Sequence, residues 1–139
     1  MRSLVIAFAA AGTIAWAAPS FAQSVAEPTV RTVISSQIDA FRTGDDERAF
    51  SFASPSIRSM FGTSENFMAM VKSGYQPVYA PRNFTFGRSS ERGGTYFQEV
   101  LVTGPEGREW VALYTLQEAS DGSIRITGVR LARSNAPAI

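Results

Sequence analysis

Three short turn-like segments separate four apolar runs in the second half of the chain, and this spacing constrains the fold more than any other feature. The separators are SSERGG, GPEG and SDG, whose compositions are typical of hairpin turns. The apolar runs have the length of strands and read NFTFG, TYFQEVLVT, REWVALYTLQ and SIRITGVRLAR. Because short turns join antiparallel neighbours, the pattern predicts a four-stranded antiparallel meander.

The last apolar run changes phase near its middle. Ile124 and Ile126 share one face of the expected strand, and the alternation then shifts to Val129 and Leu131. Gly128 lies at the shift, and glycine inside a strand often marks a bulge. We therefore expect a β-bulge at Gly128 that bends the sheet.

The first half of the chain has the periodicity of helices. Between Pro28 and Arg42 the apolar residues follow the i, i+3, i+4 spacing of an amphipathic helix. The amide of Gln37 falls within the apolar stripe, where it must find partners or cost about 1–3 kcal/mol. This position makes Gln37 the first candidate for a binding residue.

Three short helices are expected after this one. Their predicted caps are Asp45 or Asp46, Ser54 followed by Pro55, and Thr63 or Ser64. Their predicted stops, including that of the first helix, are Gly44, Gly62 and Gly74. The segment YQPVYAPR contains two prolines and is expected to run extended as a connector. Helices followed by a meander predict an α+β fold, with the helices packed across one concave face of a curved sheet.

The N-terminus has the three-part pattern of a secretory signal peptide. Arg2 precedes an apolar run from Leu4 to Ala18, and small residues follow. The run is too short for a membrane span, which needs about 20 apolar residues. We expect cleavage between Ala22 and Gln23 and delivery to the periplasm or medium of a Gram-negative bacterium, with no membrane attachment afterwards.

The expected organisation has one folded unit. The predicted segments are a signal peptide over 1–22, a short N-terminal segment over 23–28, a single α+β domain over 29–133 and a flexible tail over 134–139. Without Arg2 the chain has 12 basic and 12 acidic residues. This balance gives no electrostatic reason to bind nucleic acid or an anionic membrane.

Two residue types are absent from the whole sequence, cysteine and histidine. Disulfides are therefore excluded, and so are the usual zinc, copper, haem and iron–sulfur sites. The Ser-His-Asp and Cys-His catalytic arrangements are excluded as well. We expect no metal, no cofactor and no assignable catalytic residue.

Several strings carry a family resemblance. QIDAFRTGDDERAFSFASPSIRSMFG, ENFMAMV, GYQPVY and GVRL resemble domain of unknown function 4864, a family of small secreted proteins from Gram-negative bacteria. The resemblance covers residues 29 to 132 and implies the nuclear transport factor 2-like fold, a cone also called cystatin-like. That superfamily includes ketosteroid-isomerase-like enzymes, dehydratases, ligand carriers and non-catalytic binding domains, so the resemblance implies no particular activity.

In a cone of this kind, the inner face of the first helix looks toward a cavity. Gln37 could orient a ligand there, or it could be a buried amide bonded to a backbone carbonyl. The aromatic candidates for the pocket are Tyr75, Tyr79, Tyr96, Trp110 and Tyr114. Each could equally be a core residue, because aromatic residues that share a strand face commonly pack together.

Three classes of function remain open from the sequence. The preferred one is a non-catalytic domain that binds a small amphipathic ligand in the cone or a protein on the sheet. The second is a cofactor-independent isomerase or dehydratase that uses a tyrosine and a carboxylate. Glu99 and Glu109 are the strand carboxylates to consider, but both alternate away from the neighbouring tyrosines. The third is a structural homodimer.

Overall fold

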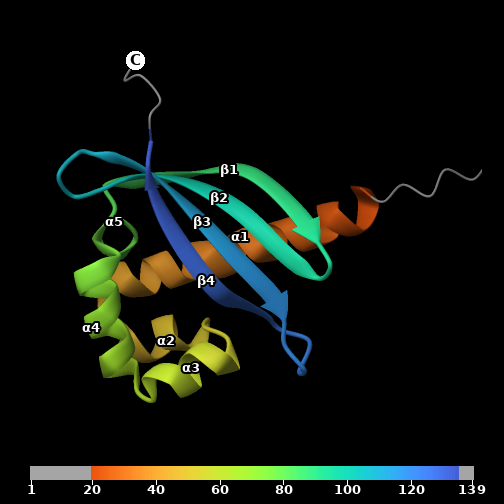
Figure 1. Cartoon of the computed structure of the whole chain (residues 1–139), viewed down its shortest axis with the longest axis horizontal. Helices are drawn as coiled ribbons and strands as arrows, with labels where there is room; N and C mark the ends of the chain where they lie inside the picture. Colours follow the sequence, from red (N-terminus) through yellow and green to blue (C-terminus); the bar gives the residue numbers. More distant parts are fainter. Residues whose placement is uncertain (1–19, 135–139) are drawn as a thin grey trace, which may run out of the picture.

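The computed structural model describes residues 20–134 of the chain, with side chains described from Ala26 onward. Helices precede strands in this part (Figure 1). The helices are α1 (Ser20–Thr43), α2 (Asp46–Ser51), α3 (Pro55–Phe61), α4 (Ser64–Gly74) and α5 (Gln76–Tyr79). The strands are β1 (Asn83–Arg92), β2 (Thr95–Thr103), β3 (Glu109–Glu118) and β4 (Ile124–Arg133). Most of the expected signal peptide and nearly all of the expected tail lie outside the described residues.

The sheet has the order β1-β2-β3-β4, and every neighbouring pair is antiparallel. The predicted meander is therefore confirmed. The first hairpin turn is shorter than the sequence suggested, because β1 continues through Arg92 and only Gly93 and Gly94 form the turn. Both glycines have positive φ angles, 57° and 83°, as tight two-residue hairpin turns require.

The predicted bulge in β4 is also confirmed. Thr115 pairs with Gly128 and Leu116 pairs with Ile126, so no residue of β3 lies opposite Thr127 in the backbone ladder. A Cβ atom at position 128 would lie 3.1 Å from the Thr115 hydroxyl oxygen, which favours glycine there. The alternation of β4 therefore changes phase where the sequence changes phase.

A second bulge lies in β1, and the sequence analysis did not predict it. The pairing passes from Phe86 opposite Val100 to Ser89 opposite Gln98, which leaves one extra residue in β1. The amide nitrogen of the buried Gln98 contacts the carbonyl oxygens of residues 87 and 88 at 3.3 Å and 3.4 Å. The same nitrogen donates to the Glu99 carbonyl oxygen at 2.8 Å, so this side chain links the backbones of β1 and β2 at the bulge.

The helix boundaries largely follow the predicted caps and stops. The side chains of Asp45, Ser54 and Thr63 each accept a hydrogen bond from a backbone N–H at the start of α2, α3 and α4. Gly44 and Gly62 have φ angles of 69° and 76°. The first helix begins earlier than its apolar pattern, since α1 includes Pro28 and starts at Ser20. The expected cleavage position after Ala22 lies in its first turn.

The extended connector predicted over YQPVYAPR is wrong, because residues 76–79 form the one-turn helix α5. Pro77 lies in the first turn of α5, where its missing N–H would have no intrahelical partner in any case. Only Pro81 lies outside a helix, as the extended connector required of both prolines, because it comes after the end of α5.

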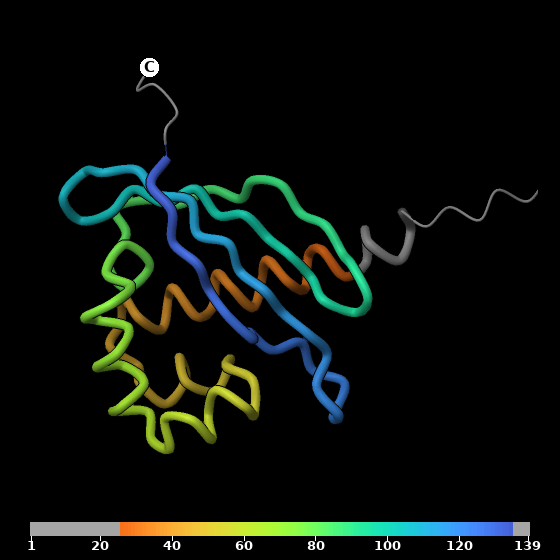
Figure 2. The backbone as a smooth tube through the Cα atoms, viewed as in Figure 1, coloured from red at the N-terminus to blue at the C-terminus, as the bar shows by residue number. Residues whose placement is uncertain are grey.

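The helices form a layer on one side of the sheet (Figure 2), and the buried apolar residues form two clusters. One cluster joins α1 to the sheet through fully buried residues that include Ile34, Ile38 and Val100. The other joins α1, α2 and α4 around Phe41, Phe67 and other residues. Between residues 20 and 134, no helix combines the length and the hydropathy needed to cross a membrane.

The helix stops at Gly44 and Gly62 lead to a stability prediction. A Cβ atom at either position would meet nothing within 4 Å, so the left-handed backbone alone penalises a side chain. We expect Gly44→Val and Gly62→Val each to lower the free energy of unfolding by about 1–2 kcal/mol. Gly44→Asn is the matched control, because asparagine tolerates this conformation. The free energies of unfolding can be measured by urea denaturation. A valine variant as stable as the wild type would contradict the helix end at that position.

Candidate ligand cavity

A cavity of about 260 Å³ lies where the two apolar clusters meet. Its walls come from α1, α3, α4, α5, β3 and β4, so helices and sheet both contribute. Phe41 and Phe67 belong to the helical cluster, while Val78 and Ile126 belong to the sheet cluster. The cavity is therefore the space that remains between two well-packed groups of side chains.

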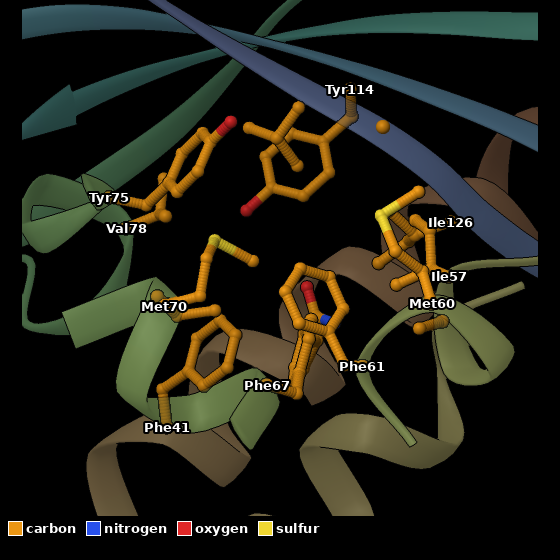
Figure 3. Close-up of a pocket in the computed structure, with 15 residues that line it drawn as sticks. Phe41, Ile57, Met60, Phe61, Phe67, Met70, Tyr75, Val78, Tyr114 and Ile126 are labelled. Carbon is orange, nitrogen blue, oxygen red and sulfur yellow. The ribbon is translucent and has the colours of Figure 1, made fainter. Parts of the chain in front are cut away.

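The walls are almost entirely apolar. None of the 15 lining residues, all within the described part of the chain, carries a charge. Ile57, Met60 and Phe61 of α3 form one side, and Met60 is 75% exposed. Figure 3 shows Ile57, Met60 and Ile126 grouped on one side, with Tyr75 and Val78 on the other. A cavity with this lining excludes charged ligands, because a buried ion without a partner is very costly.

Gln37 lines the cavity from α1 and is only 3% exposed. Its amide nitrogen donates a hydrogen bond of 3.1 Å to the carbonyl oxygen of Ala49 in α2. Gln37 is thus a buried amide bonded to a backbone carbonyl, which was one of the two interpretations of the sequence. It also borders the cavity, as the interpretation of Gln37 as a ligand-orienting residue requires. Whether Gln37 orients a ligand stays a prediction.

Tyr114 projects from the middle of β3 and is completely buried. Its hydroxyl has no hydrogen-bond partner within residues 20–134. Burial raises the pKa of this phenol above its ordinary range, so the group stays neutral and keeps its proton. In Figure 3 the hydroxyl points toward the middle of the lining side chains, between Met70 and Phe61.

Tyr75 is the third predicted residue that lines the cavity. It follows α4 and caps α5, and its ring is half-buried against both apolar clusters. The rings of Tyr75 and Tyr114 approach the cavity from α5 and β3 respectively (Figure 3). The structure therefore brings together Gln37, Tyr75 and Tyr114.

The other three candidates do not line this cavity. Tyr79 packs against Phe41, with ring centroids 6.0 Å apart. Tyr96 borders a separate hollow of about 120 Å³ near the start of β2. Trp110 lies at the other end of the sheet, with the Arg133 guanidinium 5.7 Å from its ring centroid.

Distance along the strands explains this separation. Trp110 and Tyr114 share one face of β3, but four residues of strand span about 13 Å. In the same way, Tyr96 pairs with Leu116, beyond Tyr114. Alternation identifies the face of a strand on which a side chain lies, and it carries no information about position along that face.

α3 and Met70 also line the cavity, and the sequence does not predict this. The apolar residues Ile57, Met60 and Phe61 have the pattern of a buried helix face, but no residue of α3 is fully buried, and Met60 is 75% exposed. Met70 was part of the methionine-containing string ENFMAMV, whose pattern is equally typical of ordinary packing. The missing information was the position of α3 and α4 beside the sheet, which depends on long-range contacts.

No carboxylate is among the residues that line the cavity. Glu99 forms an ion pair with Arg88 at 3.3 Å, and Glu109 is exposed at the start of β3. No group of three or more potential metal ligands occurs within the described residues. The cavity therefore offers hydrogen bonds from neutral groups and a large apolar surface.

The buried Tyr114 hydroxyl leads to a prediction about pH and stability. A phenol whose pKa is raised by folding contributes stability below its unfolded pKa of about 10, and this stability is lost at higher pH. We expect Tyr114→Phe to be at least as stable as the wild type at pH 7, because it removes an unpaired polar group. Between pH 9 and pH 11 the wild type should lose about 1.4 kcal/mol more than the variant. Urea denaturation at each pH measures both effects, and a variant clearly less stable at pH 7 would show that the hydroxyl has a partner.

Two solved structures are similar to this chain. A protein of unknown function from Burkholderia xenovorans, described as NTF-2 like, is 16% identical, with a TM-score of 0.50 over 80% of this chain and 89% of that one. A DUF4783 family protein from Bacteroides ovatus is 10% identical, with a TM-score of 0.48 over 72% of this chain and 94% of that one. No curated protein matches the sequence.

The helices followed by an open antiparallel sheet, and the likeness to the Burkholderia protein, show an α+β fold of the nuclear transport factor 2-like type. The family model for domain of unknown function DUF4864 matches residues 23–139. That match includes every described strand and all helices from α2 onward. The chain therefore belongs to the family of domain of unknown function DUF4864.

Proposed function

We propose that the protein binds a small, uncharged and largely apolar molecule in the cavity between its helices and its sheet. The observation that carries the proposal is the lining: 15 residues of the described chain, none charged, among which only Gln37, Tyr75 and Tyr114 have polar side-chain groups. Ligand sites in proteins typically combine a concave apolar surface with a few polar groups that fix orientation.

The size of the cavity supports a ligand of modest dimensions. The space of about 260 Å³ opens toward the surface, where it is bordered by Met60, which is 75% exposed. An engineered apolar cavity of about 150 Å³ in another protein takes up benzene. The larger volume here suits a molecule with two fused rings or a comparable aliphatic group.

Binding is better supported than catalysis. A proton-transfer enzyme needs a base within hydrogen-bond reach of the reacting proton. The described residues that line the cavity provide neutral donors and acceptors without any carboxylate. Ligand binding requires only the apolar surface and the polar groups that are present.

We also propose that the protein acts in the periplasm or outside a Gram-negative cell. Its N-terminal sequence has the three parts of a signal peptide. The matched family region begins at Gln23, the residue after the expected cleavage position. The binding domain is thus separate from the segment that would direct export.

Binding can be measured with 1-aminonaphthalene, an uncharged fluorescent molecule with two fused rings whose emission changes in apolar surroundings. We expect saturable binding with a dissociation constant below about 100 μM. Met70→Trp should weaken binding at least tenfold, because the larger side chain occupies part of the cavity. Isothermal titration calorimetry would provide the affinities independently of tryptophan fluorescence.

Leu101→Trp is the matched control for that substitution. Leu101 is 45% exposed on β2 and does not line the cavity, so the same indole is added elsewhere. Circular dichroism melts would check that both variants fold. Equal affinity of the wild type and folded Met70→Trp, or no saturable binding by the wild type, would contradict the proposed site.

Export can be tested by expressing the full chain in a Gram-negative host. We expect the protein in the periplasmic or culture fraction, with an intact mass and an N-terminal sequence that begin at Gln23. Arg2 and the apolar run would then be absent from the mature protein. A cytoplasmic protein that retains residues 1–22 would overturn the proposed location.

A further inference from the structure

We infer that the molecule bound in the cavity carries an uncharged hydrogen-bond acceptor, such as a ketone oxygen, which accepts a hydrogen bond from the Tyr114 hydroxyl. This inference rests on the proposed function and specifies the chemical class of the ligand. It starts from the one buried hydroxyl of the described chain that is without a partner.

The unpaired hydroxyl is energetically unfavourable in the unliganded protein. A buried donor without a partner costs about 1–3 kcal/mol, whereas phenylalanine would fill nearly the same volume without that cost. Tyr114 is 0% exposed, and its hydroxyl has no hydrogen-bond partner within residues 20–134. A ligand acceptor in the cavity would remove the penalty and gain affinity from it.

The side-chain amide of Gln37, another polar group at the cavity, already has a hydrogen-bond partner. The Gln37 nitrogen donates to the Ala49 carbonyl oxygen at 3.1 Å, which fixes the side chain between α1 and α2. Tyr114 is the described lining residue whose hydrogen-bond donor is both fully buried and without a partner. A polar ligand atom therefore fits beside the Tyr114 hydroxyl, while the remaining walls suit apolar parts of the ligand.

The ligand reaches this hydroxyl by displacing a flexible neighbour. The Tyr114 oxygen is shielded from solvent, and it points toward the space between Met70 and Phe61 (Figure 3). Met70 is half-buried, and the unbranched methionine side chain changes rotamer more easily than branched or aromatic ones. A modest movement of Met70 would expose the donor to a bound molecule.

The uncharged lining of the cavity determines which type of acceptor can bind. A carboxylate or phosphate would enter a site whose described lining includes no cation, and an ammonium group would find no anion. Either ion would lose its hydration without compensation. A neutral oxygen loses much less and gains the Tyr114 hydrogen bond, so the structure favours ketones, esters and ethers over acids and amines.

A matched pair of ligands tests this inference. 2-Acetylnaphthalene has a ketone oxygen, and 2-isopropylnaphthalene has nearly the same shape with a methyl group in place of that oxygen. The preference is the dissociation constant of the hydrocarbon divided by that of the ketone, measured by calorimetry. We expect this preference to fall about three- to tenfold from the wild type to Tyr114→Phe.

Tyr79→Phe is the matched control, since Tyr79 lies outside the cavity lining and loses the same hydroxyl. Its preference should equal that of the wild type. The infrared carbonyl stretch of bound 2-acetylnaphthalene provides a second measurement: its frequency should be lower in the wild type than in Tyr114→Phe. This shift reports the hydrogen bond itself, and a merely structural role of Tyr114 would not cause it.

The outcomes separate the two proposals. If both ligands bind the wild type but the preference and the carbonyl frequency are unchanged in Tyr114→Phe, the cavity binds ligands and the inference about Tyr114 is wrong. If neither ligand binds the wild type, both proposals are overturned. If the ligand preference falls and the carbonyl frequency rises in Tyr114→Phe but not in Tyr79→Phe, the acceptor site is established.

Discussion

The cavity depends on a short contact between the helical layer and the edge of the sheet. The backbone N–H of Ser54 donates to the Ile126 carbonyl at 2.8 Å, and the N–H of Ile126 donates to the Phe52 carbonyl at 2.8 Å. These two bonds form a parallel bridge that covers part of the open edge of β4, beside the bulge at Thr127. Ala53 and Ile126, the paired residues, both line the cavity. The bridge therefore fixes the position at which α2 and α3 meet the sheet.

With that attachment in place, the helices and the sheet form two packed clusters that do not fully merge. α1 buries Ile34 and Ile38 against the sheet, while Phe41 on the same helix packs against Phe67 of α4, with ring centroids 6.3 Å apart. The space between the clusters is bounded by flexible methionines and by a tyrosine without a partner. The proposed ligand would occupy this space.

The sequence predicts the parts of this fold that depend on local rules. Gly44 and Gly62 terminate helices because glycine tolerates positive φ, and Gly128 marks a bulge because the hydrophobic alternation shifts there. Local rules were insufficient for α5, where Pro77 is compatible with a first helical turn as well as with an extended connector. They were also insufficient for the site. Gln37, Tyr75 and Tyr114 line the same cavity, whereas Trp110 does not. Hydrophobic alternation predicts the face of a strand on which a residue lies, but it does not predict where along the strand a cavity forms. The bridge at Ile126 is made by backbone atoms and leaves no side-chain signature.

The proposed site requires that the cavity between α3, α4 and β4 is open and apolar. Crystals of the mature protein exposed to xenon would test this most directly, because xenon occupies apolar cavities without needing a specific functional group. We predict a xenon atom among Tyr114, Met70 and Ile57, with the two apolar clusters unchanged around it. A structure with no xenon anywhere in this cavity would contradict the proposed binding site.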